Sequence, residues 1–170
     1  LWVKFQQGVS AKMPPAKLNL LLSIPIVRGL IRKKILTALG LDQCTYAVGG
    51  AAPMPPELLK WYERLGLPII EGYGMTENCA VSHATLPGVQ RPGTVGPVYD
   101  GVQHRIDPVS GEVQILSANL MMGYYKEPAL TAEAFTADGW LRTGDKGSID
   151  GEGNLRITGR VKDLFKTSKG

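Results

Sequence analysis

The sequence is poor in cysteine, in aromatic residues and in long apolar runs. Only Cys44 and Cys79 occur in 170 residues, and aromatic side chains make up 7%. The two cysteines form neither a disulfide framework nor a metal-binding spacing, so Cys79 is interpreted as a packed thiol rather than a nucleophile. No apolar run approaches the roughly 20 residues of a membrane-spanning helix. These absences exclude a disulfide-stabilised secreted domain and an integral membrane protein, and we expect a cytoplasmic one.

A strong charge of one sign is also absent. The formal net charge is +4, and much of the excess lies in Arg28, in residues 32–34 and in residues 160–169. A nucleic-acid partner would need a broader basic face with aromatic residues inside it. We therefore expect acidic small molecules as ligands and no nucleic acid. The lone His83 and His104 have no partners at metal-ligand spacing, so neither is predicted to bind a metal.

The stretch at residues 68–77 predicts a nucleotide site. Pro68–Ile70 have the length and β-branching of a buried strand, and Gly72 and Gly74 allow a sharp turn that brings the backbone close to a ligand. The alternative interpretation of residues 68–77 is an ordinary strand and glycine turn that binds no ligand.

Three side chains in this turn offer different chemistry. Tyr73, interpreted as standing free at the end of the strand, can stack on a base, and Thr76 can donate a hydrogen bond to a phosphate oxygen. Glu77 can hold a hard cation such as Mg²⁺.

The residues before this turn predict an α/β arrangement. Apolar spacing predicts helices over residues 1–12, 25–39 and 55–65, with a short strand over residues 44–48 and a glycine turn at 49–53. Strand, turn, helix and strand make a βαβ unit, whose parallel sheet would place both glycine turns at one edge. The helix at 25–39 has a basic polar face that could lie on an anionic membrane, although most such faces are simply solvated.

The residues after His83 predict a β-rich part. Short alternating runs predict strands over residues 93–96, 102–106, 112–116, 141–145 and 154–158, with hairpin turns at 107–111 and 150–153 and a brief helix at 128–135. The fold class is therefore α/β, with a parallel-sheet βαβ subdomain at 1–90 and a β-rich, distorted barrel-like subdomain at 91–159. Residues 160–170 are interpreted as a hinge toward a further domain.

Several motifs together resemble one enzyme superfamily. GYGMTE at residues 72–77 resembles the signature of the adenylate-forming (AMP-binding) superfamily of acyl-CoA synthetases, luciferases and peptide-synthetase adenylation domains. GEVQI at 111–115, MGYY at 122–125, DGWLRTGD at 138–145 and GRVKD at 159–163 follow in the order of that superfamily. Residues 138–162 also resemble the longer signature of fatty acyl-CoA synthetases, with departures at Lys146, Ile149 and Gly151, and residues 165–170 look most like the long-chain enzymes.

The resemblance implies roles for individual residues. Asp145 and Arg160 would bind the ribose, where a carboxylate accepts hydrogen bonds from two hydroxyls. Thr76 would contact the α-phosphate, Glu77 would hold the metal, and Lys162 would be the hinge between large and small domains. The first glycine turn, with Gly50, Ala51 and Ala52, would lie along the adenine and the acyl pocket. Tyr73 would contact the adenine, and Gly72 and Gly74 would also belong to the nucleotide site.

The implied activity is that of an ATP-dependent long-chain fatty acid–CoA ligase. A fatty carboxylate and MgATP would give acyl-AMP and pyrophosphate, and coenzyme A would then displace AMP. The alternatives are adenylation of another carboxylate, such as an amino acid or aryl acid, and a non-catalytic nucleotide-binding or peripheral membrane module.

The sequence is also expected to be a piece of a longer chain. Leu1 is not an initiator, and the superfamily's phosphate loop and its C-terminal domain with a catalytic lysine have no counterpart in the 170 residues. The piece alone is therefore predicted to be inactive.

Overall fold

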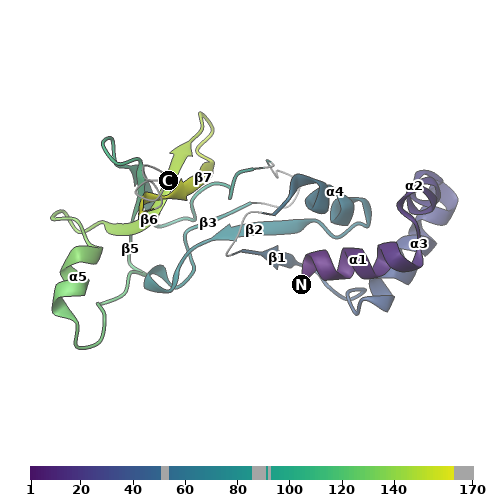
Figure 1. Ribbon diagram of the computed structural model, residues 1–170, viewed down its shortest axis with the longest axis horizontal. Coiled ribbons are helices and arrows are strands. Elements are labelled where there is room, and N and C mark those ends of the chain that lie inside the picture. Colours follow the sequence, from purple (N-terminus) through teal and green to yellow (C-terminus); the bar gives the residue numbers. More distant parts are fainter. Residues whose placement is uncertain (51–53, 86–90, 92, 163–170) are drawn as a thin grey trace, which may run out of the picture. The chain divides into compact units, whose positions relative to one another are not determined.

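The computed structural model describes residues 1–50, 54–85, 91 and 93–162. The chain divides into two compact units, Leu1–Ile70 and Glu71–Gly170, and Figure 1 labels their elements. The sequence placed its subdomain boundary 20 residues later, at 90/91. Residues 71–85 group with the second unit because their backbone pairs there: Ala84 N–H donates to Pro97 O at 3.3 Å and Tyr99 N–H donates to Ser82 O at 3.0 Å.

The first unit is mainly helical. In chain order it contains α1 (Trp2–Lys12), α2 (Pro15–Ser23), α3 (Pro25–Ala38), β1 (Ala47–Gly49), α4 (Pro56–Arg64) and the start of β2 (Ile69–Tyr73). The three helices expected from apolar spacing are present. The additional helix α2, which begins at Pro15, was not predicted. A proline also fits the first turn of a helix, and α2, α3 and α4 all begin in this way.

Two small cores hold the first unit together. Leu58 and Tyr62, one helical turn apart on α4, pack against Ala47 of β1 and Ile69 of β2. The Tyr62 hydroxyl donates to the Trp2 carbonyl at 2.8 Å, and burial raises the pKa of Tyr62 to about 12. The second core joins α2 and α3 through the buried Leu18, Leu22, Ile35 and Leu65.

The second unit is mainly β-structure. It contains the 3₁₀ turn η1 (Thr76–Asn78), β3 (His83–Ala84), β4 (Val102–Ile106), β5 (Glu112–Ser117), α5 (Pro128–Ala134), β6 (Leu141–Ile149) and β7 (Leu155–Arg160). Strands β4-β5-β6-β7 form a curled antiparallel sheet, and β1-β2-β3 form a three-stranded one. The predicted α/β class with a barrel-like β part is confirmed.

The two predicted hairpin turns are present and are closed by aspartates. Asp107 Oδ1 accepts backbone N–H bonds from Val109 and Ser110 at 3.1 and 2.7 Å. Asp150 Oδ1 accepts those of Glu152 and Asn154, each at 2.9 Å. These bonds favour the ionised carboxylates and hold the pKa of both aspartates below the usual range.

One predicted strand is absent. Residues 93–96 form no strand, because the left-handed φ angles of Gly93 (82°) and Gly96 (83°) interrupt an extended conformation. Their backbone still pairs with β7: Val95 N–H donates to Leu155 O at 2.8 Å, and Leu155 N–H donates to Gly96 O at 2.9 Å. The interior of this unit contains Val102, Val113, Ile115 and Leu155.

No helix within the described ranges combines the length and the apolar character that a membrane crossing requires.

Candidate functional site

The glycine turn after β2 is closed tightly on itself. Ala80 N–H donates to Met75 O at 2.9 Å and Cys79 N–H donates to Thr76 O at 3.1 Å. A Cβ added at Gly74 would lie 2.5 Å from the Ala80 carbonyl carbon. Only glycine fits at this position, and the closed turn leaves the Thr76 side chain exposed.

Tyr73, Asp145 and Arg160 meet in the second unit. The Tyr73 hydroxyl donates to Asp145 Oδ2 at 2.8 Å, and Arg160 Nη1 donates to Asp145 Oδ1 at 2.7 Å. The Asp145 side chain is 13% exposed, whereas that of Arg160 is 60% exposed. Each carboxylate oxygen keeps a second lone pair, so Asp145 can accept further hydrogen bonds from a ligand.

Tyr73 differs from its sequence interpretation. It does not stand free, because its ring is half-buried and its hydroxyl is bonded to Asp145. Burial raises the pKa of Tyr73 above its ordinary value, so the phenol stays protonated and donates.

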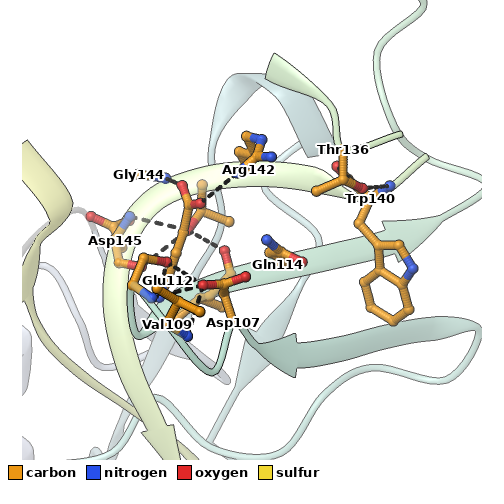
Figure 2. A network of polar contacts seen from close by, with 12 residues as sticks. Asp107, Val109, Glu112, Gln114, Thr136, Trp140, Arg142, Gly144 and Asp145 are labelled. Atoms are coloured by element: carbon orange, nitrogen blue, oxygen red, sulfur yellow. Dashed lines mark hydrogen bonds and ion pairs between the residues drawn. The ribbon is translucent and has the colours of Figure 1, made fainter. Parts of the chain in front are cut away.

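Asp145 lies in a bulge of β6 (Figure 2). The bulge contains Gly144, with φ +72°, whose N–H donates to Glu112 Oε1 at 2.9 Å. Thr143 Oγ1 donates to Val113 O at 2.7 Å and accepts the Asp145 N–H at 3.1 Å. Two side chains thus replace the backbone bonds that a regular ladder would make.

A second carboxylate, Glu77, is held by the segment before α5. The Tyr124 hydroxyl donates to Glu77 Oε1 at 2.8 Å, and Met121 N–H donates to Glu77 O at 2.7 Å. Tyr124 is held in turn by its own N–H, which donates to Thr131 Oγ1 at 2.9 Å. Within the described part of the chain, Glu77 Oε2 has no hydrogen-bond partner, so this oxygen is available to a ligand.

The structure shows no contact of the remaining predicted site residues with Asp145 or Glu77 among the residues it describes. Gly72 is in β2 opposite Ala84 of β3. Gly50 is exposed in the first unit, and Lys162 is exposed at the end of the described chain. Ala51, Ala52 and residues 163–170 lie outside the described residues, so their expected roles stay predictions.

Sequence reasoning missed a histidine pair, formed by the buried His83 and the half-buried His104. His83 Nε2 lies 2.7 Å from His104 Nδ1, and Ser82 Oγ lies 2.7 Å from His83 Nδ1. Burial, with a smaller contribution from His104, lowers the pKa of His83 to about 3. The two residues are 21 positions apart and become neighbours only when β3 and β4 are folded, so no local signal could pair them.

The turn that precedes β6 is also tightly organised. Trp140 N–H donates to Thr136 Oγ1 at 2.9 Å, a contact drawn in Figure 2. The Arg105 guanidinium lies 4.3 Å from the Trp140 ring centroid and pairs with Asp138 at 2.7 Å. These contacts brace the start of the strand that carries Asp145.

The arrangement supplies binding groups rather than a nucleophile with its base. The cluster around Asp145 can accept hydrogen bonds from neighbouring hydroxyls, and the Arg160 guanidinium can donate to an anion. No group of three or more metal-ligating side chains occurs among the residues the structure describes. A hard cation at Glu77 would therefore share this single carboxylate with water and ligand oxygens, which suits Mg²⁺.

Comparison with known proteins identifies a family model and several relatives that match this chain. The family model described as AMP-binding enzyme matches residues 13–125. The chain is 42% identical over 141 residues to a Mycobacterium tuberculosis protein described as fatty-acid–CoA ligase FadD11, covering 83% of this chain and 24% of the relative. It is 36% identical over 149 residues to the long-chain-fatty-acid–CoA ligase ACSBG2 of Gallus gallus, covering 85% and 20%.

A solved structure has a similar fold. It is a malonyl-CoA ligase in a ternary product complex with methylmalonyl-CoA and AMP bound. The TM-score is 0.64 at 34% identity, over 75% of this chain and 29% of the other. The chain thus spans a quarter or less of the length of the curated relatives described above, 24% and 20%.

Proposed function

Because this chain belongs to the AMP-binding enzyme family, we propose that it is part of an ATP-dependent fatty acid–CoA ligase acting on long-chain acids. The enzyme would join a fatty carboxylate to AMP with release of pyrophosphate, and coenzyme A would then displace the AMP. The observation that carries this proposal is the presentation of Asp145 on a bulge, between the Tyr73 hydroxyl and the Arg160 guanidinium.

In this proposal the nucleotide is held by groups of both clusters. Asp145 accepts hydrogen bonds from the ribose hydroxyls, and Arg160 adds a contact to the ribose or phosphates. Thr76 donates to the α-phosphate from the exposed face of its turn. Tyr73 orients Asp145 through its hydroxyl and lies along the adenine side. Catalysis would come mostly from positioning and charge stabilisation.

Glu77 is proposed to hold Mg²⁺ with the phosphate oxygens. Its half-buried carboxylate is oriented by Tyr124 through one oxygen, while Oε2 remains for the cation. Bound there, the cation would neutralise charge on the phosphates. The chain's own contribution is to keep this carboxylate fixed next to Thr76.

The proposal also specifies the chain length of the carboxylic acid substrate. FadD11 and ACSBG2 support a fatty acid, whereas the malonyl-CoA ligase has the same fold with a short dicarboxylate. Another carboxylate is therefore the rival substrate. Turnover of the full-length protein with acids of graded length plus coenzyme A decides between them: the highest kcat/KM for long chains is expected, and a maximum at short, dicarboxylic or aromatic acids contradicts the proposal. We expect residues 1–170 alone to be inactive.

Two variants of the full-length protein test the nucleotide site itself. Asp145→Ala should raise the KM for ATP, because ribose contacts are made in the ground state and transition state alike. Glu77→Ala should instead lower the rate of acyl-adenylate formation. Small and equal effects of the two substitutions would mean that the nucleotide binds elsewhere.

We also propose contact of the first unit with an anionic membrane surface, in the cytoplasm. No aspartate or glutamate precedes Asp42, and the cations of this stretch are Lys4, Lys12, Lys17, Arg28, Arg32, Lys33 and Lys34. Beside them, Leu20, Ile26 and Leu30 are 64%, 88% and 70% exposed. Exposed apolar side chains among cations are typical of interfacial helices.

Vesicle sedimentation tests the membrane proposal. The full-length protein should sediment with vesicles containing phosphatidylglycerol and remain in solution with phosphatidylcholine alone. The double variant Ile26→Ser, Leu30→Ser should bind less, whereas Val109→Ser, at a 93% exposed position of the second unit, should not change binding. Equal binding by all three proteins would contradict the proposal.

A further inference from the structure

We propose that Glu112 is a positioning residue for the nucleotide, because its carboxylate holds the Gly144 peptide and thereby fixes where Asp145 stands. The inference rests on the proposed function, in which Asp145 binds the ribose. It assigns a task to a residue of the GEVQI stretch for which the sequence motifs indicated no role.

The register of β5 and β6 creates the need for such a residue. Glu112 pairs with Lys146 and Gln114 pairs with Arg142. Two steps along β5 (112 to 114) therefore correspond to four steps along β6 (142 to 146). The extra residues must leave the ladder, and their backbone groups need other partners.

Glu112 supplies the partner for the middle of the bulge. Its Oε1 accepts the Gly144 N–H at 2.9 Å, while Arg142 Nη1 lies 3.5 Å from Oε2 on the other side (Figure 2). The residue is 6% exposed, so its carboxylate has little water to bond instead. A charged acceptor bonded to a backbone N–H is a strong and directional contact.

The peptide that Glu112 holds directly precedes Asp145. Gly144 has φ +72°, a conformation that glycine adopts readily and can also leave readily. Without this acceptor, the N–H of the half-buried Gly144 would lose its partner, and the peptide would turn to find another one. Such a turn would move the Asp145 carboxylate away from the Tyr73 hydroxyl.

Nucleotide affinity of the full-length protein, measured by titration calorimetry with AMP and with ATP, tests the inference. Glu112→Ala should raise the Kd for both about 5- to 10-fold, which corresponds to about 1 to 1.4 kcal/mol at 1.4 kcal/mol per tenfold change. Glu112→Gln keeps an oxygen acceptor of the same shape and should stay within about twofold of wild type.

A matched control separates positioning from general loss of stability. Gln114 is also buried in β5, 1% exposed, and borders the bulge, but its Oε1 accepts from Arg105 Nε at 2.6 Å and not from a backbone N–H of the bulge. Gln114→Ala should lower the melting temperature much as Glu112→Ala does while leaving the Kd for AMP unchanged. If Gln114→Ala and Glu112→Ala weaken AMP binding equally, the inference is overturned.

A double-mutant cycle with Asp145→Ala completes the test, because a residue that acts through Asp145 has nothing further to lose once Asp145 is gone. Adding Glu112→Ala to Asp145→Ala should then leave the Kd unchanged within about twofold. A further 5-fold loss overturns the inference. If Glu112→Ala does not fold, Thr143→Val removes the second support of the bulge, the bond to Val113 O, and should give the same pattern.

The same cycle distinguishes failure of the inference from failure of the proposed function. If Asp145→Ala alone leaves AMP affinity unchanged, the ribose role of Asp145 is wrong, and the role of Glu112 falls with it. If Asp145→Ala weakens binding and Glu112→Ala does not, only the inference is overturned.

Discussion

The Tyr73 hydroxyl donates to Asp145 Oδ2 at 2.8 Å, a contact between residues 72 positions apart. Asp145 is paired along the backbone with Arg160, whose guanidinium donates to Oδ1. The carboxylate is therefore held from two sides by donors with different exposure. A ligand that binds to Asp145 therefore finds the carboxylate already oriented by Tyr73 and Arg160.

Replacing Tyr73 by phenylalanine should weaken ATP binding. The variant keeps the half-buried ring but loses one hydrogen bond to a charged acceptor, so we expect the Kd for ATP to rise about 3- to 10-fold. Fluorescence or calorimetric titration of the full-length protein measures this change. Tyr99→Phe is the control, because Tyr99 is 43% exposed in the same unit. An unchanged Kd in Tyr73→Phe would show that Asp145 needs no such support.

Replacing Tyr124 by phenylalanine should slow acyl-adenylate formation. The loss of the hydroxyl frees Glu77 Oε1 to turn, and one charge-assisted hydrogen bond corresponds to roughly a 5- to 10-fold lower rate when Mg²⁺ is not saturating. ATP–pyrophosphate exchange at graded Mg²⁺ concentrations measures it. The neighbouring Tyr125, 86% exposed, provides the matched Tyr125→Phe control. Equal rates for the two variants would show that the Tyr124 hydroxyl does not contribute to acyl-adenylate formation.

The pair of His83 and His104 should make the free energy of unfolding depend on pH. Since the pKa of folded His83 is lowered to about 3, an unfolded chain binds a proton below about pH 6.5 that the folded chain does not. This stability is present in full above about pH 6.5 and is lost as the pH falls toward 3, at about 1.4 kcal/mol per unit. The pKa of His104 is lowered in the same direction.

Urea unfolding between pH 8 and 5 measures this dependence. The His83→Gln variant lacks the titrating group, so its free energy of unfolding should fall less steeply with acid than that of the wild type. The two proteins should differ in slope below about pH 6.5 and run parallel above pH 7. Parallel curves over the whole range would mean that His83 does not contribute.

Replacing Lys162 by proline should separate the two half-reactions. If Lys162 is the hinge that the sequence predicts, a fixed φ near −65° holds the domains in one pose. Transfer to coenzyme A is then lost while acyl-AMP still accumulates, as single-turnover assays would detect. Lys162→Ala keeps the backbone free and should retain both steps. Equal losses in both steps for Lys162→Pro would leave Lys162 an ordinary surface lysine.

Local sequence signals determined most of the elements. Period-3.6 apolar spacing with proline at the first turn accounts for α3 and α4, because these patterns act within one or two helical turns. The hairpin turns at 107–111 and 150–153 formed as predicted, and in the structure Asp107 and Asp150 bond to backbone N–H groups two to four residues away. The motif at residues 72–77 marked the turn that Gly74 makes possible.

Contacts between distant segments were decided by the tertiary structure. The partnership of Tyr73 with Asp145 depends on how the end of β2 meets β6, and the His83–His104 contact depends on β3 meeting β4. The role of Glu112 depends on a two-residue shift in register, which the alternation of apolar and polar residues in either strand does not encode. The sequence thus indicated which residues are candidates for the site, whereas the packing and pairing of the strands decided which of them touch, because a side chain's partner lies on another strand and not among its neighbours along the chain.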